Sequence, residues 1–175
     1  MIDTMSKRQR SWVMSRVRGQ HTKPEVVVRM LLHRRGLRFR LGGRGLPGKP
    51  DIVLPKHSTV IFVHGCFWHL HRGCKNARMP ASNQDYWKKK LEANRARDKV
   101  NLAALKKAGW KVVTVWECEI MKCPNQVVDD ILRTLGIRKK IEYELSMQDS
   151  AVLKVAEKRS RYLISEGDRK RDKTT

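Results

Sequence analysis

Five candidate metal ligands lie within residues 64–74, which read His-Gly-Cys-Phe-Trp-His-Leu-His-Arg-Gly-Cys, in a chain with only six histidines. Zn²⁺ prefers thiolate and imidazole ligands, and a closed tetrahedral set of four is typical of a structural site. The spacing predicts such a site from three residues of this segment and one cysteine after a later strand: Cys66, His71, Cys74 and Cys118. The alternative is that the cysteines are small core residues.

The fourth zinc ligand has a second candidate, Cys123, because spacing alone does not choose between it and Cys118. Cys118 directly follows a predicted strand and begins a helix, where a thiolate is favoured. The four cysteines could pair as disulfides in an exported protein, but three lie near histidines, which favours metal in a reducing compartment. Zinc is therefore one expected cofactor.

His64 and His69 are left over by this zinc set. Imidazole titrates near neutral pH, so His69 could act as a general base or donate a hydrogen bond to a phosphate. The alternative is that His64 simply ends a strand and His69 is a solvated loop residue. Only geometry decides between these interpretations.

Asp51 follows Pro50 at the start of a predicted strand, beside the far end of the next strand near Val63. In metal-dependent nucleases, a carboxylate at a strand start and an oxygen from the adjacent strand bind Mg²⁺. Because no second acid stands near Val63, its backbone carbonyl would have to be the second ligand. The alternative is an ordinary Pro-Asp turn.

Glu25 belongs to the segment Thr22-Lys-Pro-Glu25, which reads as a capping box with Pro24 in the first helical turn. A capping-box acid satisfies backbone N–H groups at the start of a helix. Glu25 could do this and also serve as an acid of the active site.

Three aromatic side chains accompany these groups, since Phe67 and Trp68 lie between predicted zinc ligands and Trp87 begins a long helix. We expect them to be exposed and held rigidly next to a basic surface. Apolar side chains of this kind can insert between base steps and kink a duplex. The alternative is that both tryptophans pack on the core.

The elements that position these residues alternate along the chain. Strands are predicted at residues 38–41, 51–54, 58–64 and 110–116, and helices from the capping box to residue 36, over about residues 82–108 and from residue 117 onward. This order indicates an α/β sandwich with a mixed central sheet flanked by helices.

The length of 175 residues suits one domain, which we expect over residues 21–137. Residues 1–20 are expected to form a basic arm that lies on DNA. Residues 138–175 are charged, with an amphipathic stretch near Ile141–Ile164 and a tail that we expect to be partly disordered.

The net charge of +22 favours a polyanionic partner, because 39 basic residues would otherwise repel one another against only 17 acids. Residues 1–50 hold 13 of the basic residues and only two acids, which makes this region the expected footprint on DNA. Charge alone fits a ribosomal or nucleic-acid-coating protein equally well. No apolar run could span a bilayer and no signal peptide is evident, so we expect a cytoplasmic protein with no membrane partner.

The segments LPGKPDIV, VIFVHGCFWHLHRGC and GWKVVTVWEC resemble the very short patch repair endonucleases, and the resemblance runs from about Met5 to Leu135. It implies the restriction-endonuclease-like fold. It also implies Mg²⁺-dependent nicking 5′ to the thymine of a T·G mismatch that arises by deamination of 5-methylcytosine.

The same resemblance assigns roles to individual residues. Asp51 and the Val63 carbonyl would bind Mg²⁺, His69 would activate water, and Glu25 and His64 would assist around the phosphate. It implies that Cys66, His71, Cys74 and Cys118, rather than Cys123, bind zinc. It also implies residues that meet the DNA, which are Met14, Phe67, Trp68, Trp87, Asn94 and Asp98.

Two positions depart from the family pattern. Val63 replaces a threonine, so only its carbonyl remains as a ligand, and Gly73 adds one residue between His71 and Cys74. A zinc loop should tolerate this insertion, because such a loop is flexible before it binds metal.

The sequence thus predicts a strand-specific mismatch nickase that initiates very short patch repair. The alternatives are a zinc-organised, non-catalytic DNA-binding protein and a restriction endonuclease that cuts both strands of a matched duplex. A single active site is enough for a nickase, so a monomer is expected. The flanking recognition sequence, a cognate cytosine methyltransferase and any mismatch-repair partner cannot be inferred from the sequence.

Overall fold

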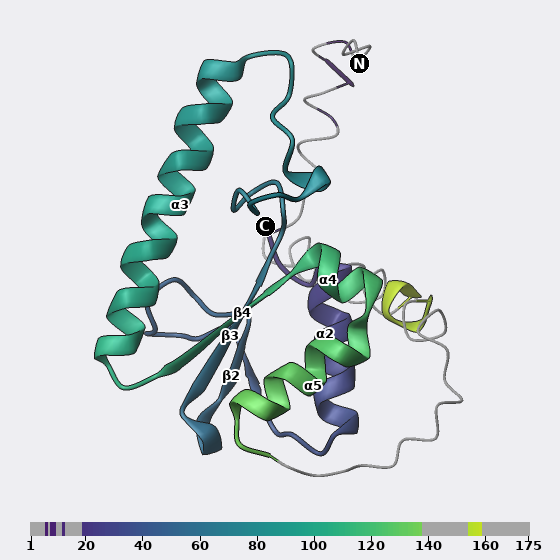
Figure 1. Cartoon of the computed structure of the whole chain (residues 1–175), viewed down its shortest axis with the longest axis vertical. Coiled ribbons are helices and arrows are strands. Elements are labelled where there is room, and N and C mark those ends of the chain that lie inside the picture. Colours follow the sequence, from purple (N-terminus) through teal and green to yellow (C-terminus); the bar gives the residue numbers. More distant parts are fainter. Residues whose placement is uncertain (1–5, 7, 10–11, 13–18, 138–153, 159–175) are drawn as a thin grey trace, which may run out of the picture.

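A computed structural model describes residues 6, 8–9, 12, 19–137 and 154–158. Its elements (Figure 1) are, in chain order, α2 (Lys23–Arg34), β1 (Arg40–Leu41), β2 (Ile52–Leu54), β3 (Thr59–His64), α3 (Gln84–Lys107), β4 (Lys111–Trp116), α4 (Glu117–Lys122) and α5 (Pro124–Thr134), with 3-10 turns at Pro55–His57 and Lys75–Ala77. The four strands lie in the order β1-β2-β3-β4. The first three are antiparallel, and β4 runs parallel to β3, so the predicted mixed sheet is confirmed.

Alternating side chains of the sheet fill two hydrophobic cores. Ile52, Leu54 and Ile61 pack in the core that also holds residues of α2, α4 and α5. Val53 and Val60 point to the other face, in the core that includes residues of α3. Figure 1 shows α3 on one side of the sheet and the three shorter helices on the other, which is the expected sandwich.

The strand directions bring distant residues to one end of the sheet. Because β2 and β3 are antiparallel, with Ile52 opposite Ile61, the start of β2 lies beside the end of β3. Because β3 and β4 are parallel, with His64 opposite Trp116, both strands end together. The residues just before β2, just after β3 and just after β4 therefore meet at the same edge.

Two predicted boundaries differ from the structure. The strand expected over residues 38–41 is reduced to Arg40–Leu41. The helix expected from residue 117 is two helices that break at Cys123, because Pro124 cannot donate the backbone hydrogen bond that would continue α4. Pro124 instead occupies the first turn of α5, where its missing N–H costs nothing.

Most of the predicted arm, including Met14, lies outside the described residues, as does most of the stretch Ile141–Ile164. Residues 154–158 are helical, and Ala156 is fully buried in the core that contains α2. Glu157 forms an ion pair of 3.3 Å with Lys23 of α2. Part of the charged carboxyl-terminal region thus packs on the domain.

Within the described part of the chain, no helix is long and apolar enough to cross a membrane.

Candidate active site and zinc site

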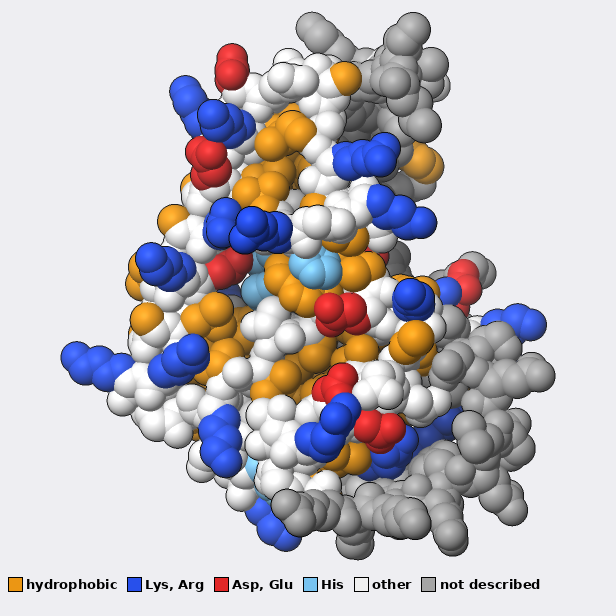
Figure 2. Space-filling view, in the orientation of Figure 1, with side chains coloured by type: hydrophobic (Ala, Val, Ile, Leu, Met, Phe, Trp, Pro, Cys, Tyr) orange, Lys and Arg blue, Asp and Glu red, His pale blue; other side chains and the backbone are white. Residues whose placement is uncertain are grey.

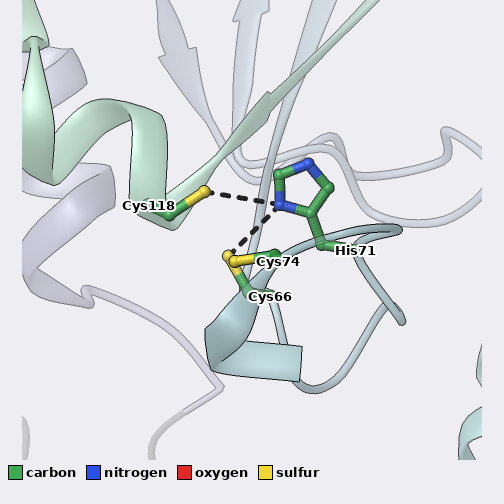
Figure 3. Close-up of side chains that lie close together, drawn as sticks. All are labelled: Cys66, His71, Cys74 and Cys118. Atoms are coloured by element: carbon green, nitrogen blue, oxygen red, sulfur yellow. Dashed lines mark hydrogen bonds between the residues drawn. The ribbon is translucent and has the colours of Figure 1, made fainter. Parts of the chain in front are cut away.

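The four predicted zinc ligands converge from the loop after β3 and the start of α4 (Figure 3). One donor atom each from Cys66, His71, Cys74 and Cys118 lies within 4.8 Å of the others. The Nδ1 atom of His71 is 3.5 Å from the sulfur of Cys66 and 3.4 Å from that of Cys118. A tetrahedral zinc ion separates a sulfur and a nitrogen ligand by roughly 3.6 Å, given its usual bond lengths. The spacing of the donors therefore fits zinc.

The structure separates the two candidates for the fourth ligand. Cys118 is part of the cluster, whereas Cys123 is exposed and outside it. All four cysteines are free thiols, so the disulfide alternative is not seen. The ring of His71 stacks on Trp116 with centroids 4.0 Å apart, which fixes the imidazole against the end of β4.

The inserted Gly73 has a structural explanation. Its φ of 74° lies in the left-handed region that glycine adopts without strain. The loop turns tightly here, with the N–H of His71 bonded to the carbonyl of Cys66 and the N–H of Cys74 bonded to the carbonyl of His71. The extra residue is accommodated inside this turn.

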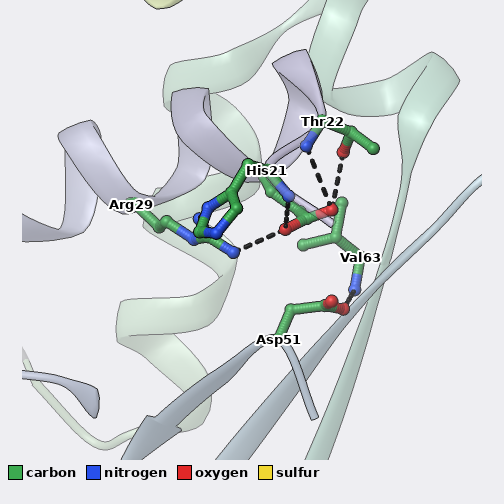
Figure 4. Close-up of polar contacts among 6 residues, drawn as sticks. His21, Thr22, Arg29, Asp51 and Val63 are labelled. Carbon is green, nitrogen blue, oxygen red and sulfur yellow. Dashed lines mark hydrogen bonds and ion pairs between the residues drawn. The ribbon is translucent and has the colours of Figure 1, made fainter. Parts of the chain in front are cut away.

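Asp51 lies at the start of β2, and one carboxylate oxygen accepts the backbone N–H of Val63 at 2.7 Å (Figure 4). Within the described residues, its other oxygen accepts no hydrogen bond. Burial raises the pKa of Asp51 to about 6, and the negative charge of Glu25 adds to this rise, while the Val63 N–H and the charges of Arg29 and His69 oppose it. A partly buried carboxylate with a vacant oxygen suits a hard cation such as Mg²⁺.

Glu25 is 3% exposed and lies in the first turn of α2 as the predicted capping-box acid. It accepts hydrogen bonds from the Thr22 hydroxyl at 2.8 Å and the Thr22 N–H at 3.3 Å. It also accepts the N–H of His21 at 3.0 Å and pairs with the guanidinium of Arg29 at 2.5 Å. The capping role is therefore present, and a buried cation that the sequence did not single out accompanies it.

His69 is bonded to Asp98, which lies on α3. Its Nδ1 is 2.6 Å from a carboxylate oxygen of Asp98, so Nδ1 carries the proton and the neutral ring keeps its lone pair on Nε2. His64 stacks on His69 with centroids 3.8 Å apart and an angle of 8° between the rings. Burial and the neighbouring charge of His69 lower the pKa of His64 to about 4, despite the opposing charge of Asp98. His64 is thus uncharged at neutral pH.

The nitrogen and oxygen atoms of His64, His69 and Asp98 are close enough to suggest a second metal site. Imidazole lone pairs lie in the plane of the ring, so two stacked rings direct theirs along nearly parallel lines rather than towards one point. A hydrogen-bonded and stacked pair therefore describes these residues better than ligands of one ion.

The predicted aromatic residues form a cluster beside the zinc loop. The ring of Phe67 lies 5.1 Å from that of Trp68 and 5.3 Å from that of Trp87. Phe67 and Trp68 are partly exposed, but Trp87 is only 8% exposed, so the expectation that it is exposed is wrong. Trp87 supports the other two rings from α3 and does not itself present a free face.

Asn94 holds the aromatic loop from the same face of α3, because its amide donates to the carbonyl of Trp68 at 3.2 Å. The sequence did not single out Tyr86 and Lys90. Tyr86 is 55% exposed, and the ammonium of Lys90 lies 5.4–5.8 Å from the ring centroids of Tyr86, Trp68 and Trp87. The aromatic cluster is therefore rimmed by a cation, which suits a polyanionic ligand.

One cleft of about 1400 Å³ is lined by Glu25, Asp51, His64, His69 and Asp98, and Trp68 of the aromatic cluster lines it as well. Its other wall is the glycine-rich loop over residues 42–49. Figure 2 shows histidines at the centre of one face, with lysines, arginines and acids around them. A Cβ atom on Gly48 would come within 2.9 Å of the Asn101 side chain, so glycine is needed where this loop meets α3.

A mixed sheet between two helical layers, with a buried acid and a His–Asp pair in one cleft at its edge, defines a nuclease of the restriction-endonuclease-like fold. A family model described as DNA mismatch endonuclease Vsr matches residues 2–76. The type II nicking enzyme V.XorIIP of Xanthomonas oryzae pv. oryzae is 52% identical over 120 residues, which are 69% of this chain and 88% of that protein. The chain therefore belongs to the Vsr family and is a DNA endonuclease.

Two further relatives support this assignment. The type II nicking enzyme V.NmeAIP of Neisseria meningitidis is 46% identical over 69% of this chain and 85% of its own length. The DNA mismatch endonuclease Vsr of Escherichia coli is 38% identical over 69% of this chain and 76% of its own length. The resemblance that the sequence motifs suggested is confirmed.

Proposed function

We propose that this endonuclease nicks one strand of duplex DNA 5′ to the thymine of a T·G mismatch and so initiates very short patch repair. The observation that carries the proposal is the joint position of Asp51, the His69–Asp98 pair and Trp68 of the aromatic cluster in the lining of one cleft. The relatives, which are nicking and mismatch endonucleases, favour the same activity. A monomer acting on DNA in the cytoplasm is sufficient for it.

Two metal ions complete the site in this proposal. The open oxygen of Asp51 and the carbonyl of Val63 would hold Mg²⁺, and Cys66, His71, Cys74 and Cys118 would hold a structural Zn²⁺. When bound, Mg²⁺ would offset the charge of the scissile phosphate and acidify a water molecule.

His69 is the general base. The hydrogen bond to Asp98 keeps the His69 ring proton on Nδ1, so His69 Nε2 can accept a proton from the attacking water. The resulting imidazolium is stabilised by the Asp98 carboxylate. His64 stays neutral and offers its ring face to this cation, which avoids repulsion between two charged imidazoles. Glu25 assists as a fixed negative charge near Asp51.

Phe67 and Trp68 are the residues that enter the DNA, with Trp87 as their support and Met14 from the arm as a second wedge. A mismatched step costs less energy to unstack than a paired one, so insertion selects for T·G. Asn94 contributes by fixing the loop through the Trp68 carbonyl.

The activity is tested with three end-labelled duplexes that differ only in one position: T·G, T·A and C·G. With Mg²⁺, we expect a single nick in the thymine strand of the T·G duplex, at least 10²-fold faster than any cut in the matched ones. Cutting of both strands in a matched duplex would identify a restriction enzyme instead. Binding without any cut would identify a DNA-binding protein.

Asp98→Asn should lower kcat for nicking by about 10²-fold or more, because an amide can donate to Nδ1 of His69 and shift the ring proton to Nε2. Binding of the T·G duplex should change little. The matched control is Glu92→Gln on the exposed face of the same helix, which should leave kcat unaltered. A normal kcat for Asp98→Asn would remove Asp98 from the mechanism.

A further inference from the structure

Arg29 is a largely buried cation beside Glu25 and Asp51 in the lining of the cleft. Its side chain is 11% exposed and lies one helical turn after Glu25. One guanidinium nitrogen pairs with Glu25 at 2.5 Å, and another donates to Nδ1 of His21 at 2.9 Å (Figure 4). Its Nε is buried without a hydrogen-bond partner in the described residues. A buried donor left unsatisfied costs stability, so its retention points to a functional position.

Glu25 has no remaining capacity to bind a metal while this network persists. A carboxylate offers about four lone-pair positions on its two oxygens. One oxygen accepts the N–H and the hydroxyl of Thr22, and the other accepts the N–H of His21 and the guanidinium of Arg29. Asp51, whose second oxygen has no partner among the described residues, differs from Glu25 in this respect.

The charges around the cleft also distinguish Asp51, as a possible metal ligand, from Glu25. Glu25 and Arg29 line the cleft together with Asp51, and the charges of both reach the Asp51 carboxylate with opposite signs. Arg29 therefore opposes part of the attraction that Glu25 would exert on a divalent cation. A Mg²⁺ site with one available carboxylate keeps several waters and is commonly completed by a phosphate of the substrate.

We propose that Arg29 is a positioning residue that keeps Glu25 out of the metal's coordination shell, so that the cation binds weakly to the free protein and tightly only together with DNA. This inference rests on the proposed metal site at Asp51. It makes nicking conditional on simultaneous arrival of metal and duplex. Arg29 thus disfavours metal binding in the cleft before the correct DNA is present.

The test measures Mn²⁺ binding to the zinc-loaded protein without DNA, from the electron paramagnetic resonance signal of free Mn²⁺. Arg29→Gln removes the opposing charge and releases one lone-pair position of Glu25, so we expect about tenfold tighter binding. Arg29→Lys keeps the charge and should bind as the unaltered protein does. In the double variant Glu25→Gln, Arg29→Gln, the gain should disappear. Structural damage would not produce a tighter site.

A second measurement uses the unaltered protein and needs no substitution. Because coupling between two ligands is reciprocal, Mn²⁺ should tighten binding of an uncleavable phosphorothioate T·G duplex by about tenfold or more. In Arg29→Gln this enhancement should shrink, since the metal site is already filled without DNA.

The possible outcomes distinguish failure of the proposed role of Arg29 from failure of the proposed metal site at Asp51. If Asp51→Asn abolishes Mn²⁺ binding while Arg29→Gln binds no more tightly than the unaltered protein, Arg29 has no such role although the metal site stands. Absence of the duplex effect in the unaltered protein would overturn the inference too. If Mn²⁺ binds equally well to Asp51→Asn, the metal assignment fails as well.

Discussion

Replacing Asp51 with asparagine should abolish nicking and at the same time stabilise the protein in the absence of magnesium. The variant loses the charged oxygen that would hold Mg²⁺, so we expect nicking to fall by at least about 10³-fold. DNA binding should persist, because the basic surface is unaltered. Nicking by Asp51→Asn at a normal rate would refute the metal assignment.

The gain in stability follows from the pKa of Asp51, which rises from 3.8 to about 6 in the folded chain. The folded state therefore holds this proton more tightly than the unfolded state. The ionised carboxylate destabilises the fold fully above pH 6, and this cost vanishes as the pH falls to about 4. Asp51→Asn should thus raise the free energy of unfolding at pH 7.5 by about 2–3 kcal/mol and by much less at pH 4.5.

Urea denaturation at the two pH values, without added Mg²⁺, measures this difference. Glu92→Gln is the matched control, because Glu92 is exposed on α3 and its loss should shift stability by no more than about 0.5 kcal/mol. An Asp51→Asn variant that is less stable than the parent at pH 7.5 would contradict the expected cost of burying this carboxylate. The same data would then argue for a purely structural Asp51.

Cys66→Ser should have the second large effect, since it removes the one fully buried zinc ligand. Structural zinc contributes about 10–16 kcal/mol of apparent binding energy, which equals or exceeds the whole stability of a typical domain. We expect the variant to be insoluble or to contain no zinc. Cys123→Ser, outside the cluster, is the matched control and should retain one zinc per chain and normal activity.

If Cys66→Ser cannot be purified, the prediction can be tested on the unaltered protein by removing zinc and measuring how tightly it binds again. Burial raises the pKa of the Cys66 thiol to about 12, so without metal it is protonated, and zinc must displace that proton. Zinc affinity should therefore rise with pH between 6 and 8, with release of protons into the buffer. A full zinc content in Cys66→Ser would place the metal elsewhere.

The sequence was sufficient to predict the cysteine–histidine cluster and the Asp51–Val63 contact, because both depend on short-range spacing and on strand pairing. The loop after β3 forms backbone hydrogen bonds only between residues close in sequence, such as His71 to Cys66 and Cys74 to His71, so its local spacing determines its shape. The hairpin fixes Asp51 beside Val63 for the same geometric reason that pairs Ile52 with Ile61. Choosing Cys118 over Cys123 required the end of β4 to be in place.

The contacts of His69 with Asp98 and of Trp68 with Asn94 depend on how α3 packs, which local patterns do not reveal. Its inward face carries Leu91, Asn94, Asp98 and Leu105, spaced three, four and seven residues apart as expected for one stripe of a helix. This spacing is enough to predict that Asp98 faces the cleft, but it does not predict the hydrogen bond between His69 and Asp98. Arg29 could not be found in this way, because a basic residue on a helix is ordinarily solvated.

The parallel alignment of β3 and β4 also sets when the enzyme becomes able to cut. Pairing of these strands waits for the whole of α3 between them, and such distant contacts form late in folding. A nascent chain that has not yet delivered β4 and Cys118 lacks the last zinc ligand of the loop that carries Phe67, Trp68 and His69. If this cluster holds zinc as proposed, we expect chains that end before Cys118 to lack nicking activity.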